Sequence, residues 1–506
     1  MTTSNRATEP GGRALARNAA YNVLGQAIPL VVGLATIPVT VRVLGAERFG
    51  LLGLAWAILG YVGVLDLGLG RATTKFVAEY LAAGDRARLE RVATLAVASQ
   101  TLMGLVGGAA FALVAPLLAG RALGVPPALG TEAERMLLAL ALSVPFVVLT
   151  ASLRAVLEAA QRFDLVNLIR TPTSAAVFVV PAAAAVLGAR LPAIVLLLLA
   201  VRIVSGVATA IVIPRAIPGF RWRLELRWDL LRPLLGFGGW VSVSNIVSPA
   251  LLYLERFLLA SLAGVAAVAY YTAPYEVVNR LLILPAGLAG ALYPALSAAA
   301  AAGDWQQRHE RLVGRPLRFL LLALAVPVVF LIACGGPLLG MWLGAGYAER
   351  STAALAILAA GVLINGLAHI PYAYLLARGR PDLPAKFHLL ELPLYVVVGW
   401  LLITNLGVSG AALAWTLRVT VDALLLAGAV SRIAGVSPGQ LFGARAGRAV
   451  GAVLALTAVG AAVLAWAPGA VLRIPLMAAA LAVFATVAWR RGLDATERAA
   501  IARMIG

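Results

Sequence analysis

Apolar runs of roughly 20 residues, the length that crosses about 30 Å of hydrocarbon, follow one another along almost the whole chain. Typical runs read ALALSVPFVVLTASL, LPAIVLLLLAV, FLLLALAVPVVFLIA and LALTAVGAAVLAWA. Hydrophobic residues make up 62% of the chain and charged residues only 12%, whereas about a quarter of the residues in soluble domains are charged. The sequence therefore predicts an all-α polytopic membrane protein and excludes a soluble globular domain.

The apolar runs divide the chain into about fourteen predicted transmembrane helices. The first run is too long for the apolar core of a signal peptide and carries no A-x-A site, so we expect it to remain as an uncleaved span. The predicted spans cover residues 18–44, 49–69, 89–119, 136–159, 163–187, 191–214, 233–262, 265–299, 315–342, 351–377, 384–406, 409–431, 448–467 and 470–489.

The placement of the basic residues predicts how these spans are oriented. The formal net charge is +19, and Lys and Arg concentrate in both tails and in alternate connections. By the positive-inside rule both termini and the basic connections are cytoplasmic, which predicts a multi-pass protein of the cytoplasmic (inner) membrane. Because no basic soluble domain carries this charge, we expect no nucleic acid partner. The basic connections lie near residues 71–91, 154–162, 215–232, 308–315, 378–386 and 432–448.

One basic sequence motif occurs twice in the chain and indicates an internal repeat. AAGDRARLERV and AAGDWQQRHERLV place Asp85 and Asp304 219 residues apart, each after the second span of a six-span block. Six is an even number, so both copies enter the membrane from the same side and are related by an axis along its normal, as in transporters built from parallel repeats. The other landmarks, spaced by 218 to 220 residues, are Gly45 with Gly264, Asp164 with Asp382, Gly188 with Gly407, and Gly219 with Gly439.

The repeat predicts the domain organisation. Residues 1–219 form an N-terminal six-helix lobe, 220–232 a cytoplasmic linker and 233–439 a second six-helix lobe. Residues 440–506 lie outside the repeat and supply two additional transmembrane helices and a cytoplasmic tail.

Five arginines fall well inside predicted spans, away from the span ends, and a charge at the bilayer centre costs about 2.5–3.5 kcal/mol on insertion scales. We therefore expect them to line a cavity or to pair with acids. Guanidinium groups are planar, forked donors that bind phosphate oxygens in pairs, so several of them in a dry cavity suit a diphosphate. The predicted substrate-binding residues are Arg170, Arg202, Arg256, Arg280 and Arg418.

Acidic residues inside the spans have two interpretations. In the first they couple transport to a proton or sodium ion by protonation or cation binding. In the second they only neutralise arginines, which the i,i+4 spacing of Glu276 and Arg280 favours. Arg418 and Asp422 have the same spacing. The candidate coupling residues are Glu255, Glu276, Glu391 and Asp422.

Two further groups of polar residues also have two interpretations each. Tyr270, Tyr271 and Tyr275 suit an aromatic belt at the membrane interface or stacking against sugars. Asn365 and His369, four residues apart, suit hydrogen bonding to a neighbouring helix or a proton site.

Signatures of catalysis are missing from the sequence. It has no Walker-type phosphate loop and no H-E-x-x-H, and its external connections are short. The lone Cys334 lies inside an apolar run. We predict no enzyme activity, catalytic residue, metal or cofactor, so that any pumping draws on an ion gradient or on the gradient of the substrate.

Two long stretches carry a family resemblance. Residues 16–80 combine a basic-Asn start, an LG…FG turn, a D-L-G end to the second span and a basic loop. Residues 254–297 read LERFLLASLAGVAAVAYYTAPYEVVNRLLILPAGLAGALYPALS. Both resemble polysaccharide transporters of the O-antigen flippase type, in the multidrug/oligosaccharidyl-lipid/polysaccharide exporter superfamily. That family commonly has Asp in the seventh span, where this chain has Glu255.

The resemblance implies fourteen spans and a flippase that moves a polyprenyl-diphosphate-linked oligosaccharide across the cytoplasmic membrane by alternating access, for cell-surface polysaccharide biosynthesis. It implies membrane lipid, a coupling ion and polysaccharide assembly proteins as partners, and a groove for the lipid tail at the last two spans. Three alternatives remain: a lipid II flippase of the same superfamily, a multidrug/cation antiporter, and a scaffold that transports nothing. The surplus of intramembrane arginines argues against the antiporter, whose cationic substrates favour an anionic or apolar cavity.

Overall fold

The computed structural model describes residues 12–62, 69–223, 225, 247, 250–302, 308–437, 441, 446–467 and 469–487, with residues 12–27 given by their backbone alone. The regular structure of these residues is helical throughout, as predicted. Eleven of the described helices are long and apolar enough to cross a membrane. The chain divides into two compact units, Met1–Tyr253 and Leu254–Gly506.

Two of these helices each contain two of the predicted spans. Helix α1 (Gly12–Tyr61) is broken at Gly45, and α13 (Asp382–Ala434) is broken at Gly407. Their φ angles of 75° and 55° lie in the left-handed region, which glycine enters without the steric penalty of a Cβ. Both breaks fall where one predicted span ends and the next begins. The seventh predicted span is described as helix over residues 250–263. Eleven helices, two of which contain two predicted spans each, and the helix of residues 250–263 together account for the fourteen predicted spans.

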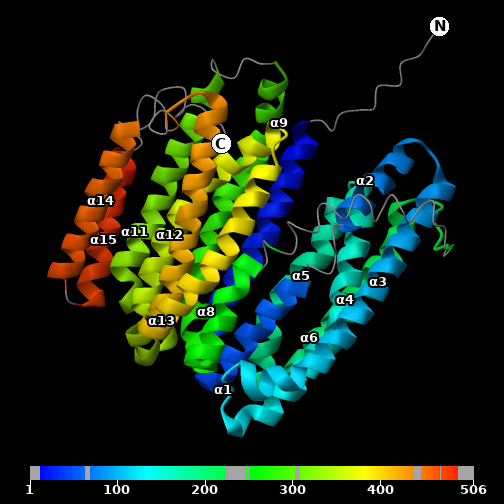
Figure 1. Cartoon of the computed structure of the whole chain (residues 1–506), viewed down its shortest axis with the longest axis horizontal. Helices are drawn as coiled ribbons and strands as arrows, with labels where there is room; N and C mark the ends of the chain where they lie inside the picture. The colour runs from blue at the N-terminus through cyan, green and yellow to red at the C-terminus, as the bar shows by residue number, and fades with distance from the viewer. Residues whose placement is uncertain are drawn as a thin grey trace. The chain divides into compact units, whose positions relative to one another are not determined.

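In the first unit, α4 lies at the centre and packs against α2, α3 and α6, while α1 packs against α5 (Figure 1). Most of the membrane-spanning residues of α4 are buried, whereas most of those in the surrounding helices are not. The helices that follow α1 are α2 (Leu69–Ala82), α3 (Arg86–Leu117), α4 (Gly130–Ala159), α5 (Phe163–Val186) and α6 (Leu191–Ala216).

Two glycines let α3 approach α4 closely. A Cβ on Gly104 would stand 2.7 Å from the Cα atom of Pro145, and a Cβ on Gly108 would stand 2.7 Å from the carbonyl oxygen of Ala141. Since both obstacles are backbone atoms, neither position has room for a larger residue without a shift of a helix. Small residues four apart are a common means of close helix packing in membranes.

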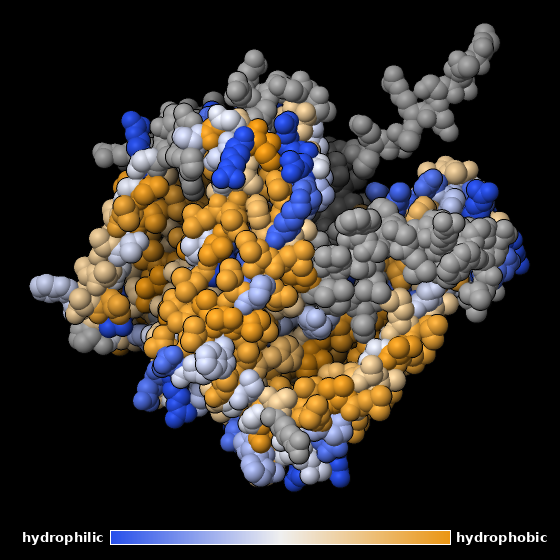
Figure 2. Space-filling view, in the orientation of Figure 1, coloured by the Kyte–Doolittle hydropathy of each residue, from blue (hydrophilic) through white to orange (hydrophobic). Residues whose placement is uncertain are grey.

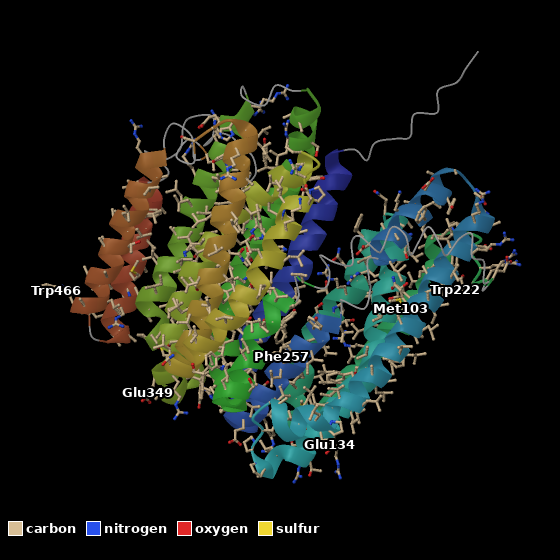
Figure 3. The ribbon with its side chains drawn as sticks, viewed as in Figure 1. Met103, Glu134, Trp222, Phe257, Glu349 and Trp466 are labelled. Carbon is tan, nitrogen blue, oxygen red and sulfur yellow. The ribbon has the colours of Figure 1, made fainter. Side chains whose placement is uncertain are left out.

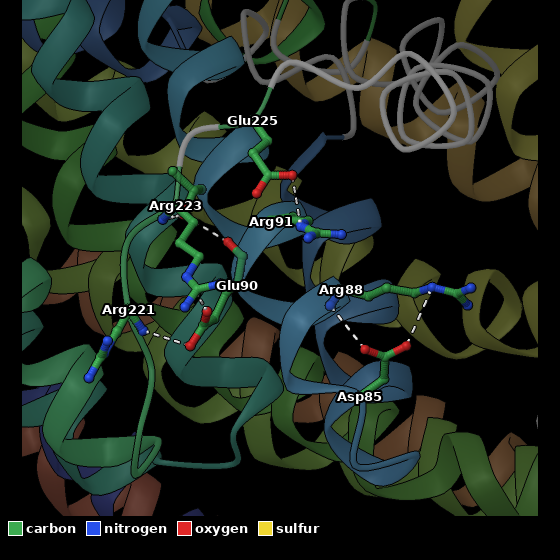
Figure 4. A network of polar contacts seen from close by, with 8 residues as sticks. Asp85, Arg88, Glu90, Arg91, Arg221, Arg223 and Glu225 are labelled. Atoms are coloured by element: carbon green, nitrogen blue, oxygen red, sulfur yellow. Dashed lines mark hydrogen bonds and ion pairs between the residues drawn. The ribbon is translucent and has the colours of Figure 1, made fainter.

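The segment after α6 is held against the start of α3 by polar contacts (Figure 4). The Glu90 carboxylate, 8% exposed, accepts a hydrogen bond of 3.0 Å from the backbone N–H of Arg221 and pairs with the Arg223 guanidinium at 3.2 Å. A second ion pair of 2.9 Å joins Arg91 to Glu225. The backbone of this segment thus follows α3 as far as residue 225.

In the second unit, α12 packs against α8, α9, α11 and α13, and α14 and α15 lie side by side against α11 (Figure 1). A Cβ on Gly361 of α12 would stand 2.7 Å from the Trp415 ring of α13, so a glycine is required there for the two helices to pack. The labelled elements are α8 (Val265–Asn279), η4 (Arg280–Leu282), α9 (Ile283–Ala302), η5 (Glu310–Gly314), α11 (Arg315–Leu343), α12 (Ala345–Ala377), α13, α14 (Ala446–Trp466) and α15 (Ala470–Val487).

The helix surfaces turned toward the viewer in the space-filling view are mostly hydrophobic (Figure 2). Large hydrophobic side chains such as Leu113 and Leu424 are exposed. Two charged side chains, Glu134 and Glu349, lie near helix ends, just after the starts of α4 and α12 (Figure 3). An apolar belt between polar helix ends is the pattern of helices surrounded by lipid.

The backbone carries paired features at the spacing on which the predicted repeat rests. Left-handed residues occur in pairs 218 to 220 positions apart, and in one pair Gln161 (φ 58°) corresponds to Gly379 (φ 68°). The other pairs are Gly45 with Gly264, Gly124 with Gly344, and Gly188 with Gly407. The predicted boundaries of the repeat, at residues 219, 233 and 439, stay a prediction.

An ion pair also recurs at this spacing, at the N-terminal starts of α5 and α13. Arg162 Nε donates to Asp164 at 2.9 Å, and Arg380 Nε donates to Asp382 at 2.9 Å. In each pair the hydrogen bond to the carboxylate raises the pKa of the guanidinium above its ordinary value. The residues around these two aspartates, QRFDL at 161–165 and GRPDL at 379–383, therefore form the same local ion pair in both units.

Candidate functional site

The most buried charged group of the second unit is the Glu255 carboxylate, with 0% of the residue exposed. The Tyr271 hydroxyl, from α8, donates to Oε1 at 3.2 Å, and the Tyr395 hydroxyl, from α13, donates to Oε2 at 2.9 Å. Two phenol groups from separate helices thus replace water around this carboxylate, as burial of a charge requires.

The neighbouring Arg256, 2% exposed, is enclosed by groups from α8. Its Nη2 atom lies 3.4 Å from Oε1 of Glu276, and its guanidinium carbon lies 4.7 Å from the centre of the Tyr275 ring. The second carboxylate oxygen of Glu276 lies 3.3 Å from Nη2 of Arg280. One carboxylate therefore contacts two guanidinium groups.

Within α13, charged groups from both sides of the Gly407 break come together. Arg418 Nη1 lies 3.6 Å from Oε2 of Glu391, and His388 Nε2 lies 3.9 Å from Oδ1 of Asp422. The Arg418 guanidinium also lies 5.8 Å from the centre of the Tyr395 ring, which connects this group to Glu255. The structure thus brings together, in one unit, three of the predicted binding arginines and all four candidate coupling residues.

The contacts agree with the neutralising interpretation for some pairs and not for others. Glu276 and Arg280 pair at their i,i+4 spacing, as that interpretation predicts. Arg418 instead pairs with Glu391, on the helix segment before the break, rather than with Asp422. Spacing along one helix could not reveal this partner, because the contact depends on how the two segments of α13 fold against each other.

The first unit holds the remaining predicted arginines in a different environment. Arg170, on α5, and Arg202, on α6, line one concavity of about 160 Å³ together with Arg154 of α4. Neither Arg170 nor Arg202 makes an ion pair with any residue that the structure describes. The hydroxyl groups that line this concavity belong to Thr150, Thr173, Ser174, Ser205 and Thr209.

A second concavity, of about 460 Å³, lies on the other side of Arg154. Lys75 and Thr74 of α2 line it, as does Glu158 of α4, which pairs with Arg154 at 3.3 Å. Sequence reasoning placed Lys75 and Arg154 in cytoplasmic connections and assigned neither to the site. The available signal was the i,i+4 spacing of Arg154 and Glu158 at the end of a span.

The two units therefore differ in their electrostatics. Unpaired guanidiniums among hydroxyl groups can bind phosphate oxygens, because arginine stays charged and presents several donors in one plane. The paired network of the second unit contains carboxylates that can gain a proton or a cation. Among the described residues, no group of three His, Cys, Asp or Glu side chains is placed to hold a metal ion.

The other polar residues of the sequence analysis are also placed. The Tyr270 hydroxyl accepts a hydrogen bond from Nη1 of Arg350, near the start of α12. Tyr271 and Tyr275 are buried and stack on each other, so they belong to the charged network. His369 Nδ1 contacts the backbone oxygen of Asn365 in its own helix at 2.9 Å.

Comparison with known proteins agrees with this fold. Residues 15–300 match the family model "Polysaccharide biosynthesis protein". A Shigella flexneri protein described as "Putative O-antigen transporter" is 30% identical over 424 residues, which are 83% of this chain and 98% of that protein.

Solved structures share the fold at low sequence identity. A multidrug resistance MATE family transporter of the MOP superfamily, in an inward-facing conformation, superimposes with a TM-score of 0.70 at 15% identity, covering 82% of this chain and 98% of its own. The lipid II flippase MurJ, in an inward closed conformation, also gives 0.70, at 13% identity, covering 94% of this chain and 99% of its own. The chain belongs to the polysaccharide biosynthesis protein family and has the fold of the MOP superfamily transporters.

Proposed function

We propose that this protein is a flippase that carries a polyprenyl-diphosphate-linked oligosaccharide across the cytoplasmic membrane by alternating access, for cell-surface polysaccharide biosynthesis. The observation that carries the proposal is the pair of guanidiniums, Arg170 and Arg202, which form no ion pair with a described residue and line a concavity among apolar helices. Relationship to a protein described as an O-antigen transporter supports the same substrate class.

The physical argument starts from the free energy of a charge removed from water. An intramembrane guanidinium is expensive unless an anion compensates it, and neither of these two forms an ion pair with a described carboxylate. Arg170 interacts with the charge of Glu158 only at longer range. A diphosphate offers several oxygens to forked donors and is itself repelled by the bilayer, so a cationic concavity lowers the barrier to its passage. A cationic drug would be repelled by the same groups, which disfavours the antiporter.

The paired network of the second unit is proposed to couple and reset transport. While Glu276 and Glu391 are ionised, they hold Arg256, Arg280 and Arg418. Binding of a proton or sodium ion to these acids, or to Glu255 or Asp422, weakens the pairs and frees the guanidiniums for the diphosphate or for acidic sugars. Loss of the ion restores the pairs and releases the substrate.

The proposal includes the setting of the protein. Both termini are cytoplasmic, the last two helices form a groove for the lipid tail, and polysaccharide assembly proteins receive the product. Because the relative is described as a transporter, we propose transport without covalent chemistry.

The deciding experiment measures movement of a fluorescent undecaprenyl-diphosphate oligosaccharide in proteoliposomes. We expect the wild type to flip it and Arg202→Ala to flip it more slowly by about 10- to 100-fold. Arg215→Ala is the matched control and should flip normally, because Arg215 is on the same helix and, among the described residues, its guanidinium bonds to the backbone oxygen of Ile211 alone. Transport of lipid II in place of the oligosaccharide would assign the lipid II alternative. Exchange of a cationic drug with no lipid movement would replace the proposal.

A further inference from the structure

The two concavities of the first unit meet at a single side chain. Arg154 lines both the 160 Å³ concavity, with Arg170 and Arg202, and the 460 Å³ concavity, with Lys75. On α4, Thr150, Arg154 and Glu158 follow one another at intervals of four and so share one helix face. Thr150 lines the smaller concavity and Glu158 the larger.

The charges along this face are unequal. Three arginines and no acid line the smaller concavity, whereas Lys75, Arg154 and Glu158 line the larger one. Glu158 is thus the single acidic side chain on the described walls of either space. Its ion pair with Arg154 joins side chains that are 35% and 45% exposed. Such a pair contributes only about 0–1 kcal/mol, so a phosphate group can displace it.

The two volumes suit different parts of one ligand. About 460 Å³ falls within the range of roughly 300–1,000 Å³ that small-molecule sites occupy, and about 160 Å³ falls below it. The larger space therefore has room for a phosphate with an attached sugar, and the smaller one for phosphate groups alone.

We propose that the larger concavity is a second phosphate site, and that Arg154 transfers the diphosphate between this site and the one at Arg170 and Arg202. The assignment of the substrate class rests on the proposed function. A guanidinium has five N–H donors, so Arg154 can keep one edge on the ligand while its other edge leaves Glu158. A change of side-chain rotamer suffices for the transfer, because both concavities are already open to this residue.

Glu158 acts in this scheme as the displaceable counterion. When the diphosphate leaves Arg154, Glu158 takes its place and prevents immediate return. Removal of the carboxylate charge should therefore tighten binding while slowing release.

The test combines binding and flipping in the full-length protein. Binding of undecaprenyl diphosphate in nanodiscs and flipping of the fluorescent oligosaccharide lipid are measured for Glu158→Gln, Arg154→Ala, Arg154→Lys and Lys75→Ala, with Arg215→Ala as the control. For Glu158→Gln we expect tighter binding by about 2- to 5-fold, the equivalent of the lost ion pair, and slower flipping by a similar factor. Arg154→Ala and Lys75→Ala should weaken both, and Arg154→Lys should recover part of the loss.

Inorganic pyrophosphate and inorganic phosphate are titrated in parallel to identify the source of the phosphate. If pyrophosphate binds to the wild type, and binds more weakly to Lys75→Ala and Arg154→Ala, the site recognises the phosphate group itself. This binding measurement does not depend on flipping. The transfer scheme would be overturned, and the flippase proposal kept, by one combination of results. In that case the wild type flips the lipid, and Glu158→Gln and Arg154→Ala match Arg215→Ala in both binding and flipping. Absence of wild-type flipping with intact, Lys75-dependent pyrophosphate binding would reject the flippase and keep the second site.

Discussion

The Tyr395 hydroxyl donates a hydrogen bond of 2.9 Å to Oε2 of Glu255, a residue 140 positions earlier in the chain. Together with the Tyr271 hydroxyl it gives each oxygen of this carboxylate, which has no contact with solvent, one hydrogen-bond donor. The bond ties α13 to the helix of residues 250–263.

Removal of one donor should destabilise the protein. Tyr395→Phe leaves a buried carboxylate oxygen without a partner, and such a loss costs about 1–3 kcal/mol. We expect a lower melting temperature in detergent for Tyr395→Phe and for Tyr271→Phe. Tyr293→Phe, at an exposed tyrosine of α9, is the control and should melt as the wild type does. An unchanged melting temperature in both buried variants would mean that the hydroxyl groups do not satisfy Glu255.

Two arginine variants should separate stability from transport. Arg202→Ala removes a guanidinium that makes no ion pair with a described residue, so we expect no loss of stability. Its loss of charge-assisted bonds to the ligand, about 1.5–3 kcal/mol, predicts flipping slower by about 10- to 100-fold.

Arg256→Ala has the opposite expected profile. It breaks a buried contact with Glu276 and the contact with the Tyr275 ring, and we expect a loss of at least about 2 kcal/mol of stability. Melting curves and flipping rates of the two variants, measured side by side, check the contrast. A melting temperature that falls equally in both would show that Arg202 also has a structural partner.

The contact between α3 and α4 should be intolerant of a methyl group. In Gly104→Ala the new Cβ meets the Cα atom of Pro145 at 2.7 Å, so a helix must shift, at a cost of about 1–3 kcal/mol. Gly120→Ala is the matched control, because a Cβ there meets nothing within 4 Å. Differential scanning calorimetry of both purified variants measures the difference in melting temperature. Equal melting temperatures would contradict the tight contact between α3 and α4.

The left-handed turn residues allow a reciprocal exchange. Gln161, at φ 58°, bears the steric strain that Gly379, at φ 68°, avoids. We expect Gln161→Gly to raise the stability by up to about 1 kcal/mol and Gly379→Gln to lower it by about 1 kcal/mol. Thermal unfolding of the two variants should therefore shift in opposite directions, and shifts of the same sign would disprove the paired turns.

The helices were predictable because hydropathy alone determines which segments cross a membrane. The glycine breaks at Gly45 and Gly407 also fall where the sequence ends one span and begins another. Pairing of charges was predictable only within a helix turn, as for Glu276 and Arg280. The contact of Arg418 with Glu391 spans the break in α13 and could not be read from spacing.

The roles of Arg154 and Lys75 in the candidate site were not predicted from the sequence, for a related physical reason. Their concavities are enclosed by α2, α4, α5 and α6, which meet only through tertiary packing. In the sequence both residues look like ordinary cytoplasmic charges near the ends of spans.

The bare charges of Arg170 and Arg202 have an electrical consequence. A diphosphate bound there nearly cancels their two positive charges, so the membrane voltage does little work on the loaded site. The empty site keeps both charges. Moving one elementary charge across a membrane potential of 100 mV changes its free energy by about 2.3 kcal/mol. A voltage negative inside would therefore draw the empty site back toward the cytoplasm, so that the proposed return step is the one driven by the energised membrane.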